Sequence, residues 1–200
     1  MKEGRIRFNS VFVSDQAPRY PRIAELKEWC GKFQKNELTP KVEGNYTGNL
    51  SFRSGEGFVI TESGLKSKEN LTNDCFVYVK GYEEQSNTFY VEGKKQSSSE
   101  SIMHHLIYMN NKEVNAVFHG HNDLIVANAG KLGLPVTEKE YASGTVALAK
   151  EVLKVLDDNK VIVLRNHGFV SLGETMKEAG ELALATLKRS KTANLAISHN

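Results

Sequence analysis

The sequence predicts an α/β fold in which helices cover a mixed β-sheet. Several segments have apolar residues at spacings of three and four, as on one face of an α-helix. Short runs of β-branched and aromatic residues lie between clusters of glycine, asparagine and serine, which is typical of strands joined by turns. Strands come first and then alternate with helices, and this order favours a sheet layered with helices.

The first half of the chain contributes one helix and a group of strands. Apolar spacing over residues 21–33 predicts an amphipathic helix. Strands are predicted at residues 49–53, 58–61, 75–79 and 88–91. Because the connections between them are short, we expect these strands to pair antiparallel.

In the second half, helices alternate with strands. Helices are predicted at residues 98–109, 146–156 and about 174–188, and strands at 116–121 and 161–164. The run at 161–164 is apolar without a break, which predicts a central strand buried on both faces.

Composition predicts one ordinary globular domain over residues 1–200, with the residues after about 188 free to fray. The chain has 200 residues and a net charge of +2, too small to attract nucleic acid or anionic lipid. We find no signal-peptide core or membrane-length apolar run and expect a cytoplasmic location. Cys30 and Cys75 form no metal or disulfide motif.

The clearest chemical signal is the pair His119 and His121 at the end of an apolar strand. Residues two apart on a strand project to one face, so both imidazoles can reach one ion, and Gly120 is expected to leave the opposite face open. His167 follows the strand at 161–164 in a similar position. Three histidines that leave one position for water or substrate are a ligand set for catalytic zinc, whereas structural zinc normally has four protein ligands.

Other interpretations of these histidines remain open. Each one alone is more often a surface or core residue than a ligand. Iron and cupin-type sites also use two histidines two apart, but they generally add a nearby carboxylate. Asp123 is poorly placed for that role, because it extends the alternation past the end of the strand.

Two further features have both a structural and a functional interpretation. Ser97 and Glu100 precede a helical pattern and form a capping box, or they mark a helix start that binds an anion beside a proton-transferring glutamate. The turns TGNLS (47–51) and TESG (61–64) can direct backbone N–H groups at a phosphate. The same residues also make ordinary hairpin turns.

Five motifs in order resemble those of the class II aldolase and adducin-head family. They are GNLSFR (48–53), FVITESGLKSKENLT (58–72), SSSESIMHHLIY (97–108), NAVFHGHN (115–122) and VIVLRNHGFVSLGETMKEA (161–179), within a match over about 44–179. The resemblance implies a three-layer αβα sandwich with a largely antiparallel sheet, assembled as a homo-oligomer, usually a tetramer, with active sites between subunits. It also implies ligands for one zinc or other divalent ion per subunit, His119, His121 and His167, with Glu100 as the proton-transferring carboxylate. The phosphate pocket that it implies is lined by Gly48, Asn49, Ser63, Gly64, Ser98 and Ser99.

The activity that the resemblance implies is a lyase reaction. An aldolase would cleave a ketose 1-phosphate of the fuculose or ribulose type to dihydroxyacetone phosphate and an aldehyde, through an enediolate that zinc stabilises. The alternatives are methylthioribulose-1-phosphate dehydratase, pentulose-phosphate 4-epimerase and an adducin-head-like interaction module without catalysis. Glu100 speaks against the epimerase, which typically has aspartate there, and the retained histidines speak against the interaction module.

The sequence departs from the family pattern in two places. Tyr46 stands where a small hydroxyl residue is usual in the phosphate loop. The stretch between His121 and His167 is short and omits the segment that carries the family's tyrosine proton donor, which leaves Tyr141 as the only tyrosine there and a hypothetical catalytic residue.

Overall fold

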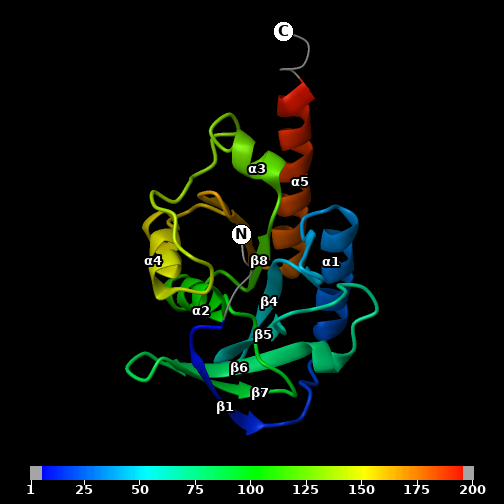
Figure 1. The fold of residues 1–200 in the computed structure, drawn as a ribbon, viewed down its shortest axis with the longest axis vertical. Coiled ribbons are helices and arrows are strands. Elements are labelled where there is room, and N and C mark those ends of the chain that lie inside the picture. The colour runs from blue at the N-terminus through cyan, green and yellow to red at the C-terminus, as the bar shows by residue number, and fades with distance from the viewer. Residues whose placement is uncertain (1–5, 196–200) are drawn as a thin grey trace.

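Helices cover both faces of an eight-stranded sheet in the computed structural model, which describes residues 6–195 (Figure 1). The strands lie in the order β1 (Asn9–Ser14), β7 (Thr88–Glu92), β6 (Phe76–Glu83), β5 (Gly57–Thr61), β4 (Asn49–Ser54), β8 (Ala116–Gly120), β10 (Gly168–Gly173) and β9 (Val161–Leu164). All neighbours are antiparallel except β1 and β7, which confirms a mixed, largely antiparallel sheet. A separate hairpin pairs β2 (Lys41–Val42) with β3 (Asn45–Tyr46).

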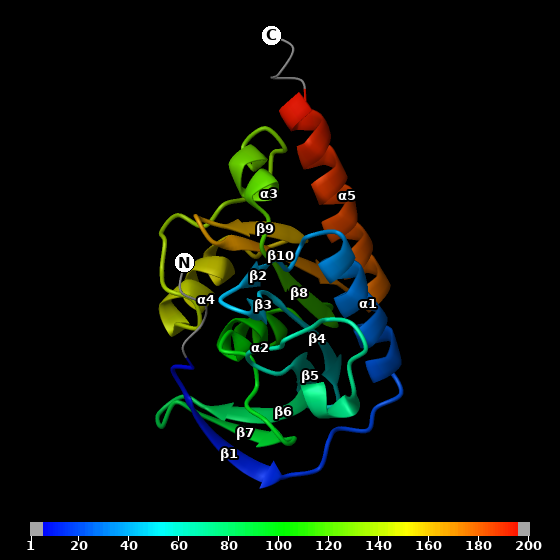
Figure 2. The same ribbon diagram turned by 45° about the vertical axis from the view of Figure 1, so that its right-hand side comes forward.

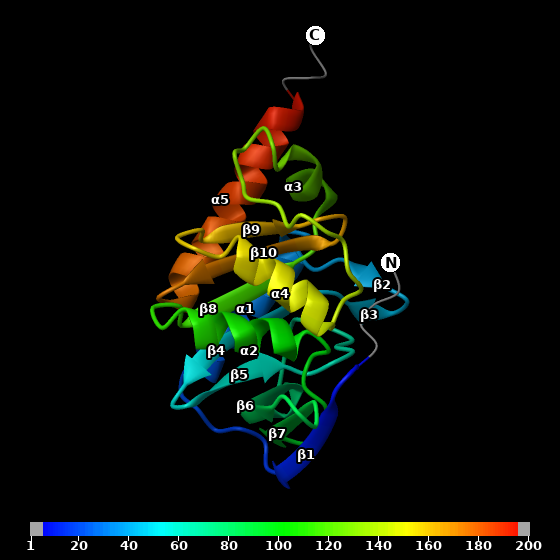
Figure 3. The ribbon, with the colours of Figure 1, turned by 90° about the vertical axis from the view of Figure 1, so that its left-hand side faces the viewer.

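The helices form the outer layers of the predicted αβα sandwich. One face carries α2 (Ser101–Asn110) and α4 (Val146–Lys154), which lie in front of the sheet in Figure 3. The other face carries α1 (Ile23–Lys35) and α5 (Met176–Leu195), and the short α3 (Asp123–Asn128) packs beside α5 (Figure 2). In the part of the chain that the structure describes, no helix combines the length and apolar character needed to cross a membrane.

Alternation along the strands divides the core into two layers. Ala116 and Phe118 of β8 join the apolar cluster under α1 and α5, whereas Val117 joins the cluster under α2 and α4. His119 has the same parity as Val117 and therefore projects on the α2 side. This parity directs the histidine toward the start of α2.

The strand β9 corrects one prediction, because it lies at the edge of the sheet and not at its centre. Its residues are nonetheless buried on both faces. Its outer edge is covered by the segment 135–137, where the Val163 amide donates to the Pro135 carbonyl and the Thr137 amide donates to the Val163 carbonyl. Because a loop covers its outer edge, this edge strand can be as apolar in sequence as a central strand.

The elements that sequence patterns did not predict are β1, β2, β3, β10 and α3. The β1 sequence NSVFVS is mostly exposed, and β10 has glycine at both ends, so neither has the usual strand signal. The final helix runs past Lys188 to Leu195, and the expected fraying otherwise falls on residues 196–200, outside the described residues.

The capping box predicted at Ser97 and Glu100 does not form. The helix α2 begins at Ser101, so Glu100 occupies the N-cap position and makes no capping hydrogen bond with its side chain. The Ser97 hydroxyl has no hydrogen-bond partner among residues 6–195. The Glu100 carboxylate is instead directed at Asn49 and His119.

The contact between α1 and α5 gives a first testable prediction. A Cβ at Gly180 would lie 2.3 Å from ring atoms of Trp29, so Gly180→Ala overpacks this contact. Overpacking costs about 1 to 3 kcal/mol, and alanine regains at most about 1 kcal/mol of helix propensity. We therefore expect urea denaturation to give a free energy of unfolding lower than wild type by up to about 2 kcal/mol. Gly130→Ala is the control, because no atom lies within 4 Å of its added Cβ, and equal losses in both variants would contradict the prediction.

Candidate metal centre and cavity

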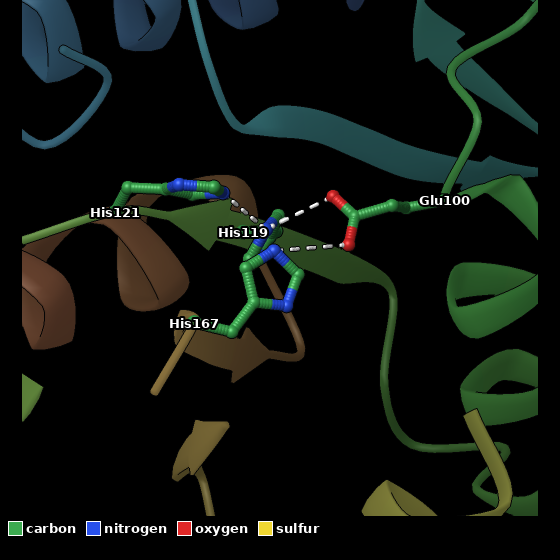
Figure 4. A group of neighbouring side chains, drawn as sticks. All are labelled: Glu100, His119, His121 and His167. Atoms are coloured by element: carbon green, nitrogen blue, oxygen red, sulfur yellow. Dashed lines mark hydrogen bonds and ion pairs between the residues drawn. The ribbon is translucent and has the colours of Figure 1, made fainter. Parts of the chain in front are cut away.

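Three imidazoles and one carboxylate converge at the carboxyl end of β8 (Figure 4). His119 lies in β8, His121 follows it, His167 lies in the turn between β9 and β10, and Glu100 immediately precedes α2. Their candidate ligand atoms all lie within 4.8 Å of one another. The structure thus brings together the four residues that the sequence singled out for metal binding and proton transfer.

Strand pairing explains how His167 reaches the other histidines. In the antiparallel pair of β8 and β10, Val170 lies opposite His119 and Phe169 lies opposite Gly120. Residues just before β10 therefore lie beside those just after β8. This register places His167 next to His121, with ring centroids 4.8 Å apart.

The hydrogen bonds of His119 determine which of its ring nitrogens carries a proton. Its Nδ1 lies 2.8 Å from the Phe169 carbonyl oxygen, which can only accept, so Nδ1 is the donor. Its Nε2 faces His121 Nε2 at 2.9 Å and Glu100 Oε2 at 2.9 Å. The backbone of β10 thus orients the His119 ring with Nε2 toward the other three side chains.

Burial and charge act in opposite directions on the pKa values of this cluster. Burial would raise the pKa of Glu100, but His119 and His167 outweigh it and hold this pKa well below its ordinary value. Burial, followed by the charge of His119, lowers the pKa of His121 well below its ordinary value. Burial would also lower the pKa of His119, yet the Glu100 carboxylate raises it overall. Glu100 is therefore ionised, and His121 is neutral.

This donor set fits a divalent cation. Imidazole nitrogen with one carboxylate oxygen suits zinc and related ions. Nitrogen and oxygen lone pairs crowd around His119 Nε2, and only a proton or a cation relieves their repulsion. Glu100 Oε1 is buried and has no hydrogen-bond partner within residues 6–195. Its nearest polar neighbour in the cluster is His167 Nε2 at 3.5 Å, and a cation held by the three imidazoles would offset the charge of this carboxylate.

A cavity of about 1000 Å³ opens beside the four residues. Glu100, His121 and His167 line it. The residues expected at a phosphate pocket all line the same cavity: Gly48, Asn49, Ser63, Gly64, Ser98 and Ser99. Tyr46, which replaces the usual small hydroxyl residue, also forms part of the wall. The expected phosphate and metal groups therefore share one space.

The glycine turn at this cavity rests directly on β8. Gly48 has φ +68°, and a Cβ there would lie 2.6 Å from the His119 carbonyl oxygen. Behind the turn, the buried Lys68 donates from Nζ to the Gly48 carbonyl oxygen at 2.7 Å. An ammonium in this position favours an anion in the cavity. Sequence reasoning missed Lys68, because lysines are mostly exposed and no local pattern marks a buried one.

The expectation that Gly120 leaves the opposite face of β8 open is wrong. A Cβ at Gly120 would lie 2.8 Å from both the Leu38 carbonyl oxygen and the Phe169 ring. The face opposite the histidines is therefore filled, and glycine is required because its neighbours already occupy the space of a side chain. This packing fixes the backbone between the two histidines.

Two other candidates lie outside the four-residue cluster. Asp123 borders the cavity but begins α3 and is not among the clustered donors. Tyr141 is 37% exposed and does not line the cavity. Tyr141 therefore stays a hypothetical catalytic residue that the lining of this cavity does not include.

Sequence reasoning also missed His104, which is completely buried behind Glu100. Its imidazole lies 2.6 Å from the Asn49 side chain, which in turn donates to Glu100. The spacing of four residues between Glu100 and His104 places both on one side of a helix and was the available signal. The side-chain amide of Asn49 is thus engaged on both sides, although the residue lines the cavity as expected.

Comparison with known proteins identifies relatives of this chain. The family model "Class II Aldolase and Adducin N-terminal domain" matches residues 24–193. A 5-methylthioribulose-1-phosphate/5-deoxyribulose-1-phosphate aldolase of Rhodospirillum rubrum is 32% identical, over 68% of this chain and 66% of the relative. An L-fuculose phosphate aldolase of Methanococcus maripaludis is also 32% identical, over 66% of this chain and 76% of the relative.

The fold also matches solved structures. A sugar-phosphate aldolase from Thermotoga maritima has a TM-score of 0.75 at 17% identity, covering 89% of this chain and 95% of that one. The match between the family model and most of the chain, together with the four-residue cluster, establishes the relationship. The chain belongs to the class II aldolase and adducin N-terminal domain family.

Proposed function

We propose that the protein is a divalent-metal-dependent aldolase that cleaves a ketose 1-phosphate to dihydroxyacetone phosphate and an aldehyde. The observation that carries this proposal is the convergence of three imidazoles and one carboxylate at a cavity lined by serine and glycine turns. An interaction module has no need of this arrangement. Membership of the family and the two aldolases at 32% identity support the same conclusion.

The metal in this proposal is zinc, held by His119, His121 and His167. Neutral imidazoles are good zinc ligands, and the low pKa of His121 keeps this ring neutral at physiological pH. When bound, the ion supplies a positive centre that stabilises negative charge on the substrate oxygens. The Phe169 carbonyl holds the His119 ring in the orientation that this ligand set needs.

Glu100 is the proposed proton carrier. Cleavage removes a proton from the C4 hydroxyl, breaks the C3–C4 bond and leaves an electron pair at C3 that must receive a proton. Glu100 is ionised beside the three imidazoles and lines the cavity, so its carboxylate can accept the proton from the C4 hydroxyl and then deliver it to C3.

The proposed phosphate site is the part of the cavity at Ser63, Gly64, Ser98 and Ser99. Hydroxyl groups and turn amides are the usual partners of a phosphate in such pockets. The buried Lys68 ammonium behind the neighbouring Gly48 turn adds positive potential. The cavity thus offers separate positions for the reacting carbons and for the phosphate.

Substrate choice is proposed from the relatives. The Rhodospirillum rubrum relative acts on 5-methylthioribulose 1-phosphate and 5-deoxyribulose 1-phosphate, as its name states, whereas several others are named for fuculose phosphate. All three sugars would give dihydroxyacetone phosphate with different aldehydes. We therefore propose that the substrate is a ketose 1-phosphate. The part that can differ is the end of the sugar farthest from the phosphate, which becomes the aldehyde.

A substrate panel tests this proposal. Purified protein loaded with zinc is incubated with fuculose, ribulose, 5-deoxyribulose and 5-methylthioribulose 1-phosphates, and dihydroxyacetone phosphate is measured enzymatically. We expect at least one sugar to release this product, and we expect a chelator to abolish the release until zinc is restored. A dehydrated ketone without dihydroxyacetone phosphate would identify a dehydratase, and an epimerised sugar phosphate would identify an epimerase. Either result would refute the aldolase.

A further inference from the structure

A continuous chain of buried hydrogen bonds leads from Glu100 away from the cavity. Glu100 Oε2 lies 2.9 Å from Asn49 Nδ2, and Asn49 Oδ1 lies 2.6 Å from His104 Nε2. Beyond the imidazole, His104 Nδ1 lies 2.7 Å from Ser51 Oγ, which lies 2.8 Å from the Tyr108 hydroxyl. All five side chains are buried.

The hydrogen bond between Asn49 and Glu100 sets the direction of every bond in this chain. Asn49 donates from Nδ2 to Glu100, which leaves its Oδ1 to accept from His104. His104 must then donate from Nε2, which makes Nδ1 the acceptor of the Ser51 hydroxyl hydrogen. Ser51 has no second hydrogen, so the Tyr108 hydroxyl donates to it. The Ser51 hydroxyl also lies 3.4 Å from the Val117 carbonyl oxygen, a longer contact than that to His104.

Neighbouring side chains hold the His104 ring in this orientation. The Phe58 ring stacks on the imidazole with an interplanar angle of 19°. At the far end, Arg53 donates to the Tyr108 carbonyl oxygen at 2.9 Å and lies over the Tyr108 ring. Burial, with a further contribution from the charge on His119, lowers the pKa of His104 to about 3, which agrees with a neutral ring that donates from one nitrogen only.

We propose that His104 is a positioning residue: it fixes the orientation of the Asn49 amide, which in turn holds the Glu100 carboxylate beside the three imidazoles. Its effect on turnover rests on the proposed function, but its effect on the position of Glu100 does not. The Asn49 amide is thereby engaged in holding Glu100. Without the donor on His104, the Asn49 amide could rotate and present its oxygen to the carboxylate.

The test compares three variants loaded with zinc. His104→Leu removes the donor to Asn49, and we expect kcat to fall about 10- to 100-fold, as for other partners behind metal sites, with KM and zinc content unchanged. His104→Gln keeps an amide N–H that can reach Asn49, and we expect kcat within about threefold of wild type. Tyr108→Phe loses a buried hydrogen bond at the far end of the chain of hydrogen bonds. We expect its Tm to fall about as far as that of His104→Leu, with kcat within about threefold of wild type.

These measurements separate positioning from general stability. If kcat in Tyr108→Phe falls as far as in His104→Leu, or if His104→Leu keeps kcat within about threefold of wild type, His104 has no positioning role. Loss of zinc in His104→Leu in proportion to activity would also overturn the inference.

Readouts without turnover keep this test separate from that of the proposed function. Nitrogen-15 NMR of wild type should show His104 protonated at Nε2, and crystal structures should show the Glu100 carboxylate displaced in His104→Leu. A proton on Nδ1 alone, or an unmoved carboxylate, would overturn the inference even in an active aldolase. An inactive wild type with both expected readouts would refute the proposed function alone.

Discussion

Replacing Glu100 by glutamine is expected to lower kcat about 10²- to 10⁴-fold, the range typical of general acid–base groups, while zinc content stays at the wild-type level. Glutamine has nearly the same shape and can still accept the hydrogen bond from Asn49, but it cannot carry a proton. The three histidines that would hold the ion are unchanged. The measurement is steady-state cleavage of the best substrate, with zinc determined by mass spectrometry on the same samples.

Glu151→Gln is the matched control for this prediction. Glu151 is another buried carboxylate, at 3% exposed, but it lies on α4 and pairs with Lys154 away from the cavity. We expect kcat in this variant to stay close to wild type. If Glu100→Gln loses its zinc, Glu100 is a metal ligand before it is a proton carrier, and the assigned role is wrong.

Replacing His121 by alanine is expected to abolish stable zinc binding and to lower kcat at least about a thousandfold, since the ion supplies several kcal/mol of charge stabilisation. Only His119 and His167 would remain of the imidazole ligands. At a hundredfold excess over Kd, zinc should add about 2.7 kcal/mol to the free energy of unfolding of wild type and so raise its Tm. The Tm of His121→Ala should be unchanged by zinc. Thermal denaturation with and without zinc measures this difference.

His105→Gln controls for the removal of a histidine. His105 lies on α2 against the rings of Tyr82 and Phe89 and is not among the clustered donors. We expect this variant to bind zinc and to gain stability from it as wild type does. A His121→Ala protein that retained one zinc per chain would show that the ion sits elsewhere.

Local patterns predicted the elements whose residues alternate or repeat strongly. The helix at 21–33 and the strand at 49–53 are found almost at their predicted bounds as α1 and β4. The histidine pair was also predictable, because strand alternation by itself places His119 and His121 on one face. The edge position of β9 was not, since an apolar run indicates burial and burial here comes from a loop that no local pattern connects to it.

The sequence by itself determined the helices and strands with strong periodicity, the family resemblance, and the residue types able to hold a metal and move a proton. Only the tertiary structure decided that Glu100 leaves its capping role, that Gly120 is packed and that Lys68 and His104 lie buried behind the cavity. The physical reason is the distance along the sequence over which each interaction acts. Periodicity and turn chemistry act over a few residues, whereas the Asn49 contacts with Glu100 and His104 span 51 and 55 positions and exist only once β4 packs against α2.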